Sequence, residues 1–299
     1  MRPHLPLSAL RVFEAAARGG SFRAAAAELL LTPSAVSHAV RKLEGDLAAT
    51  LFARDGRGMA LTPEGEVLLR HVERGFGELR YGMTAVSVRG VRLLRLHCAP
   101  SFAAQWLTPR LGRLRLACPG IELRLAASTD YTRFVGDEFD ADIVYGLPRR
   151  DGVVTVPLGE EVVTPLCAPD LARGITSAQA LRGLTLIESD NKKVRWDMWF
   201  AANGVAPPPP NGSRFDRSFL AIAAAADGLG VALESLRLAE RELASGRLVQ
   251  PLIGRAKDVR YVGHWLVFPP ARENFPPLRQ FVGWLMSELG LAPVVPARP

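Results

Sequence analysis

The chain has 299 residues, of which 48% are hydrophobic and 22% are charged, and its formal net charge is +7. This composition is typical of a globular protein with sizeable cores, and the length suits two or three domains. The basic balance permits a polyanionic partner without locating its site.

The cysteines and the apolar runs indicate the compartment. Cys98, Cys118 and Cys167 show no paired spacing, which argues against a disulfide framework and favours a reducing environment. No apolar run approaches the length of a membrane span, and the N-terminus lacks the apolar core of a signal peptide. We therefore expect a cytoplasmic protein without a membrane partner.

The first 50 residues predict three helices. Residues 7–18 form the first, and residues 21–44 form two short helices joined by a tight turn. Ser21 is the expected N-cap of the second helix, and Thr32, followed by Pro33 at the first helical position, is the expected N-cap of the third. Two helices at this spacing favour a helix-turn-helix.

The third helix has two faces. Its apolar face is expected to pack inward and consists of Val36, Ala39, Val40, Leu43 and Leu47. The opposite face carries small donors and cations, which suits a DNA major groove, although a merely solvated face is the alternative. The candidate DNA-binding residues of this helix are Thr32, Pro33, Ser34, Ser37, His38, Arg41 and Lys42.

A wing and a long helix are expected next. Two short strands flank the tip at residues 54–58, where Arg54 and Arg57 would reach a phosphate or the minor groove. Thr62 and Pro63 then begin a helix extending to about Val88. Its apolar residues recur at spacings of three and four, which favours a dimerising linker helix over a helix packed on its own domain. The repeating residues are Leu69, Val72, Phe76, Leu79, Met83 and Val86.

Beyond residue 91 short apolar runs alternate with helical stretches, as in α/β domains with mainly parallel sheets. The predicted strands are 93–98, 121–126, 143–145, 162–167, 184–187, 231–233 and 265–268. We expect two lobes with crossovers near residues 161–164 and 265–268. The expected domains are a winged helix-turn-helix (1–62), a linker helix (63–89) and a two-lobed domain (90–299), with lobe I at 90–163 and 265–299 and lobe II at 164–264.

These motifs resemble a known family. The stretches SAVSHAVRKLE, LFAR and LTPEG look like the N-terminal signature of LysR-type transcriptional regulators. WDMWFAANG (196–204) and FDRS (215–218) resemble the branch of the glycine-cleavage activator and the β-lactamase regulator. The resemblance implies an α+β multidomain fold: a winged helix-turn-helix, a linker helix and a periplasmic-binding-protein-like effector domain. It also implies promoter DNA, a small effector that alters DNA bending, a homodimer or homotetramer, and RNA polymerase as a possible partner.

An effector is expected between the lobes, at strand carboxyl ends and helix amino ends. Ser101, with Phe102 and Ala103, follows one strand and is expected to cap a helix, as is Ser218 in the other lobe. Free helical N–H groups there favour an anion, so we expect a small anionic metabolite. Simple capping is the alternative for both serines. The resemblance adds Ser128, Thr129, Tyr145, Trp196 and His264, of which Trp196 has packing, and His264 an ordinary loop position, as the alternative.

Three positions depart from the family pattern. Leu30 lies in the turn, where the family often has Gly or Asn, and a left-handed Leu would cost on the order of 1 kcal/mol. We expect either a different turn or a compensating core. Val144 and His264 replace an Arg and a Tyr of the branch, so a known ligand does not transfer directly.

Other functions require sequence motifs of their own. The five histidines show no ligand spacing, no nucleophile or phosphate-loop motif is present, and Glu160 with Glu161 is expected to be a solvated pair. We predict no enzyme, metal site or cofactor. A solute-binding protein is one alternative, and a ligand-independent or thiol-sensing regulator is another. For the latter Cys118, after two arginines, is the candidate, while Cys98 and Cys167 are expected to be buried.

Overall fold

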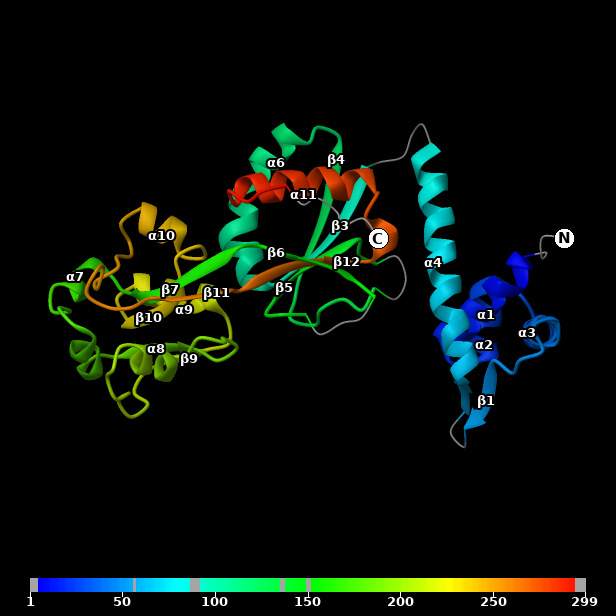
Figure 1. The fold of residues 1–299 in the computed structure, drawn as a ribbon, viewed down its shortest axis with the longest axis horizontal. Coiled ribbons are helices and arrows are strands. Elements are labelled where there is room, and N and C mark those ends of the chain that lie inside the picture. Colours follow the sequence, from blue (N-terminus) through cyan, green and yellow to red (C-terminus); the bar gives the residue numbers. More distant parts are fainter. Residues whose placement is uncertain (1–4, 56–57, 87–91, 135–137, 149–151, 294–299) are drawn as a thin grey trace. The chain divides into compact units, whose positions relative to one another are not determined.

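The computed structural model describes residues 5–55, 58–86, 92–134, 138–148 and 152–293 (Figure 1). The chain forms two compact units, Met1–Gly90 and Val91–Pro299. Each unit is described by itself.

Unit 1 is a three-helix domain followed by a hairpin and a long helix (Figure 1). Its elements are α1 (Leu7–Gly19), α2 (Phe22–Leu29), α3 (Pro33–Leu47), β1 (Phe52–Asp55), β2 (Gly58–Leu61) and α4 (Pro63–Val86). The predicted caps are confirmed: Ser21 Oγ accepts from Ala24 N at 3.1 Å, and Thr32 Oγ1 accepts from Ala35 N at 3.2 Å. Helix-turn-helix geometry is thus encoded locally.

The apolar face of α3 packs inward. Val36, Val40 and Leu43 are buried, and Phe13 of α1 is completely buried beside Leu43. Leu47, which was expected on the same face, is instead 47% exposed, because α3 ends at this residue. The packed face fixes which side of α3 points away from the domain.

The turn between α2 and α3 contains the predicted exception. Leu30 adopts φ 55° and ψ 40°, the left-handed region, and its N–H donates to Ala26 O. Its side chain is 93% exposed. A different turn, one of the two expectations, is therefore wrong: the turn is the ordinary left-handed one, and burial of Leu30 itself does not offset the strain of roughly 1 kcal/mol.

The hairpin is tied to α3 and α4. Glu44 Oε1 of α3 accepts from Leu51 N at 2.8 Å and from Phe52 N at 3.3 Å. At the start of α4, a Cβ on Gly65 would lie 2.2 Å from the carbonyl oxygen of Leu51. Only glycine permits that approach, so α4 packs directly on the backbone at the base of the wing, and Glu44 ties α3 to the same segment.

The apolar seam of α4 is divided along its length. Val72 is buried in the core of unit 1, and Leu69 and Phe76 pack against the same core. Leu79 and Met83 are 52% and 73% exposed. The first half of the predicted seam thus packs on its own domain, which was the alternative interpretation, and only the second half is free for a partner.

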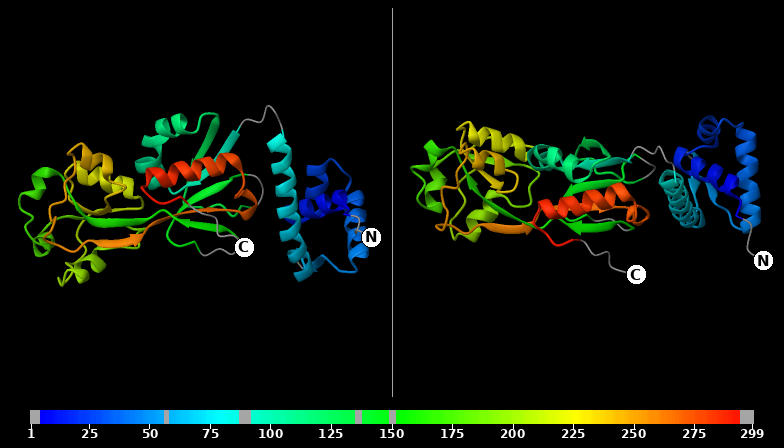
Figure 2. Two further views of the ribbon diagram at one scale, coloured as in Figure 1. Left: turned by 45° about the horizontal axis from the view of Figure 1, so that its top comes forward. Right: turned by 90° about the horizontal axis from the view of Figure 1, so that it is seen from above.

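Unit 2 consists of two five-stranded sheets (Figures 1 and 2). The sheet of lobe I has the order β4 (Ile121–Ala127), β3 (Arg92–Cys98), β5 (Ala141–Tyr145), β12 (His264–Phe268), β6 (Val154–Pro157). The sheet of lobe II has the order β11 (Val259–Val262), β7 (Glu160–Leu166), β10 (Val231–Ser235), β8 (Leu186–Ser189), β9 (Arg214–Phe215). Both sheets are mixed: β3 is parallel to β4 and β5, whereas β12 and β7 pair antiparallel with their neighbours.

Helices connect and cover the strands. In lobe I these are α5 (Pro100–Phe102), π-helix η1 (Ala103–Leu107), 3₁₀ helix η2 (Thr108–Arg110), α6 (Leu111–Ala117), 3₁₀ helix η4 (Pro270–Arg272) and α11 (Pro276–Glu288). In lobe II they are α7 (Pro169–Ala172), 3₁₀ helix η3 (Ala178–Gly183), α8 (Trp196–Ala202), α9 (Ser218–Ala226) and α10 (Glu240–Ala244).

The chain crosses between the lobes twice. The first crossover lies between β6 and β7 at residues 158–159, and the second lies between β11 and β12 at Gly263. Lobe II therefore spans Glu160–Val262, and the expected crossovers were placed a few residues late.

Candidate functional sites

The outward face of α3 is polar and unengaged. Ser34, His38, Arg41 and Lys42 are exposed and Ser37 is half-buried. Within the described residues no hydrogen bond or ion pair engages any of these five side chains. Thr32 and Pro33 begin the helix beside this face. A packed helix that presents free donors and cations has the chemistry needed to contact base edges and phosphates.

Only one of the two candidate arginines of the wing lies in the described residues. Arg54 lies in β1, opposite Met59, so the strand extends further toward the tip than its sequence suggested. Arg57 lies outside the described residues.

A cavity of about 70 Å³ lies between the two lobes of unit 2. Its volume corresponds to roughly five water molecules, which suits a small ligand. Strand ends and helix starts from both lobes form its wall. The polar side chains lining it are Ser101, Thr129, Tyr131, Tyr145, Glu161, Ser189, Asn191, Lys192, Asp216, Arg217, Ser218, Ser235, Tyr261 and His264.

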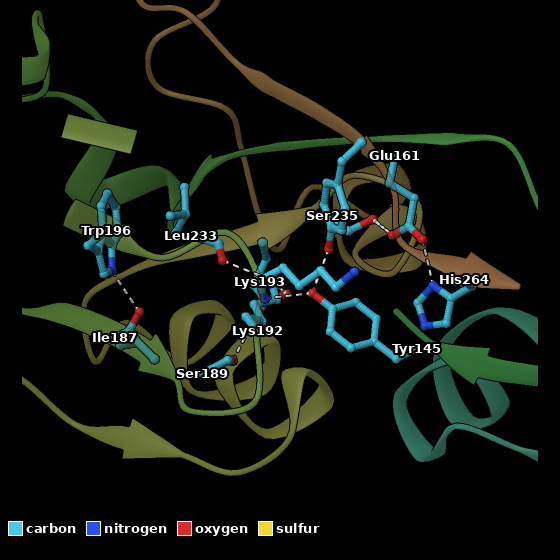
Figure 3. Close-up of polar contacts among 12 residues, drawn as sticks. Tyr145, Glu161, Ile187, Ser189, Lys192, Lys193, Trp196, Leu233, Ser235 and His264 are labelled. Atoms are coloured by element: carbon cyan, nitrogen blue, oxygen red, sulfur yellow. Dashed lines mark hydrogen bonds and ion pairs between the residues drawn. The ribbon is translucent and has the colours of Figure 1, made fainter. Parts of the chain in front are cut away.

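A buried acid–base pair closes one side of the cavity, across the crossover (Figure 3). Glu161 Oε1 lies 2.5 Å from His264 Nδ1, and Glu161 Oε2 accepts from Ser235 Oγ at 2.6 Å. Burial alone would raise the pKa of Glu161, but the charge and hydrogen bond of His264, together with Arg237, lower it to about 2. Glu161 is therefore a fixed carboxylate that joins lobe II to lobe I.

Other polar groups of the wall are also paired. Lys192 bonds to Glu234, which also accepts from Ser189 Oγ at 2.8 Å. The hydroxyls of Tyr145 and Tyr261 lie 2.7 Å apart and link the two lobes. Burial raises the pKa of Tyr145 to about 12, so this phenol is a neutral hydrogen-bonding group. Figure 3 shows Lys192, Tyr145 and His264 around the same space.

Three hydroxyls of the wall differ from this pattern. Ser101, Thr129 and Ser218 have no hydrogen-bond partner within the described part of the chain, and Ser218 is only 9% exposed. The expected capping roles are wrong: Ala99 is the N-cap of α5 and Arg217 the N-cap of α9, and neither helix has a side-chain cap. Ser101 and Ser218 lie inside their first turns, yet both line this one cavity.

Four other expected cavity residues do not line it. Trp196 packs in the core of lobe II and donates from Nε1 to Ile187 O at 2.9 Å (Figure 3), because its bulk fills the gap beneath α8. Phe102 is fully buried with its ring 4.8 Å from that of His264. Ala103 is buried at the start of η1, and Ser128 Oγ lies 2.9 Å from His97 Nε2 instead.

Several cavity residues were missed from the sequence. Glu161, expected to be solvated, is 2% exposed, whereas its neighbour Glu160 is exposed. Lys192, Arg217 and Tyr261 were not singled out either. Alternation along β7 would have offered the only local signal for Glu161, since its partners lie 74 and 103 residues away.

The cysteines fit a structural role. All three are buried, and burial raises the pKa of each thiol, that of Cys167 to about 11. Arg113, expected to activate Cys118, is paired with Glu288 instead. Reactive thiols have lowered pKa values and exposure, so thiol sensing by Cys118 is not supported.

Within the described residues, no helix is long and apolar enough to span a membrane. No group of three or more potential ligand side chains in the same residues could hold a metal ion.

Comparison with known families identifies the family of this chain. Residues 7–66 match the bacterial regulatory helix-turn-helix protein, lysR family, and residues 89–290 match the LysR substrate binding domain. The chain belongs to the LysR family of transcriptional regulators, whose members are regulators and not enzymes.

Individual relatives support the branch seen in the sequence. The chain is 53% identical over 289 residues to the HTH-type transcriptional regulator PerR of Escherichia coli, covering 97% of each chain. It is 37% identical over 288 residues to the transcriptional activator AmpR of Rhodobacter capsulatus, covering 96% of this chain and 98% of that one. The solved effector domain of AmpR from Pseudomonas aeruginosa, 29% identical, superposes with a TM-score of 0.58 over 66% of this chain and 96% of that chain.

Proposed function

We propose that this regulator binds a small anionic effector between its lobes and that occupancy of the cavity controls how α3 engages promoter DNA. The observation that carries the proposal is the convergence of Ser101 from lobe I and Ser218 from lobe II on one cavity. Their hydroxyls have no partner in the described part of the chain, whereas most polar groups around them are paired. A ligand in contact with both would favour the closed arrangement of the lobes.

The chemistry of the wall favours an anion. Helix α9 has nine residues and no side-chain cap, and it begins at Ser218 on the cavity wall, so its dipole favours an anion there. The two carboxylates that line the cavity are paired, Glu161 with His264 and Asp216 with Arg217. Glu234, which accepts from Ser189 of the wall, is paired with Lys192. A carboxylate that accepts from Ser218 and Ser101 would meet donors without meeting an unpaired acid.

Calorimetry on the full-length protein tests this site. Small carboxylates and amino acids are screened by thermal shift, and the compound that binds is titrated into the variants. Ser218→Ala should weaken binding about 10-fold, the loss of one charge-assisted hydrogen bond, and Ser101→Ala by a similar factor. Ser245→Ala, an exposed serine of the same lobe that does not line the cavity, is the control. Unchanged affinity in both cavity variants would remove the proposed site.

We also propose that α3, with Ser34, Ser37, His38 and Arg41, reads operator DNA, while Arg54 and Arg57 hold the backbone. A salt-dependent gel shift with DNA selected from a random pool tests this; a purely solute-binding protein would give no shift. The domains proposed are 1–62, 63–89 and 90–299, in a cytoplasmic regulator that acts with RNA polymerase.

Dimerisation through α4 is part of the same proposal. Leu79 and Met83 are exposed on one stripe of the helix. Leu5, Leu7 and Leu47 are exposed around an apolar groove of about 860 Å³ beside α1 and α4. Exposed apolar surface of this kind marks an association site, and a second copy would place two α3 helices on paired half-sites, with tetramers formed from such dimers.

Sedimentation measures this association. Met83→Asp should weaken self-association and shorten the DNA footprint, because a charge enters the apolar contact. Leu147→Asp, at an apolar residue of unit 2 that is 59% exposed against 73% for Met83, is the control. A dimer of unchanged strength in Met83→Asp would place the interface elsewhere.

A further inference from the structure

Three side chains from neighbouring parallel strands of lobe I form a chain of hydrogen bonds. His97, in β3, lies with Nδ1 2.8 Å from Asp142 Oδ1 of β5. Its Nε2 lies 2.9 Å from Oγ of Ser128, which directly follows β4. Nucleophile, base and orienting acid thus stand in the order that serine acylation requires, outside the cavity between the lobes.

The hydrogen bonds define the tautomer of the neutral imidazole. Asp142 is completely buried, and its second oxygen accepts from Thr132 N at 2.9 Å, so the carboxylate is held in place. Because that carboxylate accepts from Nδ1–H, the lone pair of His97 is on Nε2, toward Ser128. Asp130 N donates to Ser128 Oγ at 3.2 Å, and the hydroxyl proton has two acceptors in reach, His97 Nε2 at 2.9 Å and Asp130 O at the longer distance of 3.4 Å.

The base is rigid and the serine is reachable. The rings of Phe139 and Tyr131 lie edge-on to His97, with centroids 5.2 and 6.3 Å away. His97 is 3% exposed, whereas Ser128 is half-buried. Both line an open depression of about 550 Å³, with room for a small electrophile.

The other serines placed near polar groups lack this arrangement. Ser189 and Ser235 donate to the carboxylates of Glu234 and Glu161, which are weak bases and hold the hydroxyls in structural bonds. Ser101 and Ser218 have no base beside them within the described residues. Ser128 is the one of these five whose proton has an imidazole acceptor.

We propose that Ser128 is an activated nucleophile and a covalent modification site for small acyl esters or thioesters. Its Oγ forms a bond to the carbonyl carbon, and the bond from that carbon to the leaving oxygen or sulfur breaks. The hydroxyl proton passes to His97 Nε2 and then to the departing alcohol or thiol. The product is one O-acylserine per chain, a single modification that requires no turnover and does not depend on the effector site.

A fluorophosphonate reports such a serine directly. Ser128 Oγ bonds to phosphorus, fluoride leaves, and His97 takes the proton. In the full-length protein, intact mass should show one adduct, and peptide mapping should place it on Ser128. Ser128→Ala should give none, whereas Ser245→Ala, at an exposed serine that lines neither cavity, should react like the unmodified chain.

The role of the base is tested by rate. Asp142→Asn preserves shape but removes the anion that orients His97, so labelling should slow by about 100-fold or more. His97→Gln gives the same readout if Asp142→Asn does not fold. Tryptophan fluorescence checks folding, since Trp106, Trp196, Trp199, Trp265 and Trp284 all lie in unit 2.

Three results would overturn the proposal. They are no adduct on the unmodified chain, an adduct that persists in Ser128→Ala, and a folded Asp142→Asn or His97→Gln that labels at the unmodified rate. In each case the hydrogen-bonded chain would serve only to hold β3, β4 and β5 together.

Discussion

The exposed face of α3 and the wall of the interlobe cavity differ in whether their polar side chains have hydrogen-bond partners. On α3, Ser34, His38 and Arg41 are exposed and have no partner among the described residues. In the cavity, Glu161 and Glu234 are buried and bonded on both oxygens. Paired buried groups should therefore govern stability, whereas unpaired groups should govern binding with little effect on stability.

The largest expected effect follows from removing one half of a buried pair. Glu161→Gln leaves His264 without its carboxylate, so the free energy of unfolding of unit 2 should fall by about 3–5 kcal/mol. Urea unfolding followed by tryptophan fluorescence measures this unit. Glu160→Gln, at the exposed neighbour, is the matched control and should leave the free energy of unfolding unchanged. Equal free energies of unfolding for the two variants would contradict the contrast between buried, paired groups and exposed ones.

The same pair predicts a pH dependence. The pKa of Glu161 is lowered from 4.5 to about 2 in the fold, so its stabilising contribution is complete above pH 4.5. As pH falls from 4.5 to about 2 the carboxylate is protonated and the contribution is lost. Acid unfolding of Glu161→Gln should lack this component.

A group without a partner should behave differently. Arg41→Ala should cost about 1–3 kcal/mol of DNA affinity and relax preference at one base pair if Arg41 contacts a guanine. Stability should change by no more than about 0.5 kcal/mol. Competition binding with selected and mutated operators measures this, and Arg173→Ala in lobe II matches the charge change. A uniform loss across sequences would make Arg41 a phosphate contact.

The smallest effect concerns an apolar side chain that packs on nothing. Leu30→Asn should raise the stability of unit 1 by roughly 0.5–1 kcal/mol, because Asn tolerates the left-handed region better than Leu. Calorimetry of the full chain should show a higher melting temperature for unit 1 alone. A lower one would mean that the exposed Leu30 makes a stabilising contact.

Features that depend on neighbours in sequence could be predicted. The caps at Ser21 and Thr32 and the buried face of α3 are encoded within a few residues of each other. All seven expected strands are present, within a few residues of their predicted ends. The short strands β6, β9 and β11 were not predicted, since two to four residues acquire extended structure mainly from the partner beside them.

The cavity could be predicted only in part. Ser101 and Ser218 were expected there from strand and helix ends, although not for the capping that was supposed. Thr129, Tyr145 and His264 were expected from the family resemblance and also line the cavity. Glu161 was missed because a doublet of acids has the local pattern of a solvated turn. Trp196 was expected from the resemblance with packing as the alternative, and the alternative holds: it lies in the core of lobe II at the start of α8.

The glycine at the start of α4 has a mechanical consequence. With Gly65 against the carbonyl of Leu51, the helix leaves the wing at a fixed angle and runs 24 residues, about 36 Å. A tilt of about 10° at this joint would displace the far end by roughly 6 Å, close to two base-pair steps of DNA. In a dimer joined near Met83, a bulkier residue at position 65 would therefore alter the spacing of half-sites while leaving the chemistry of α3 untouched.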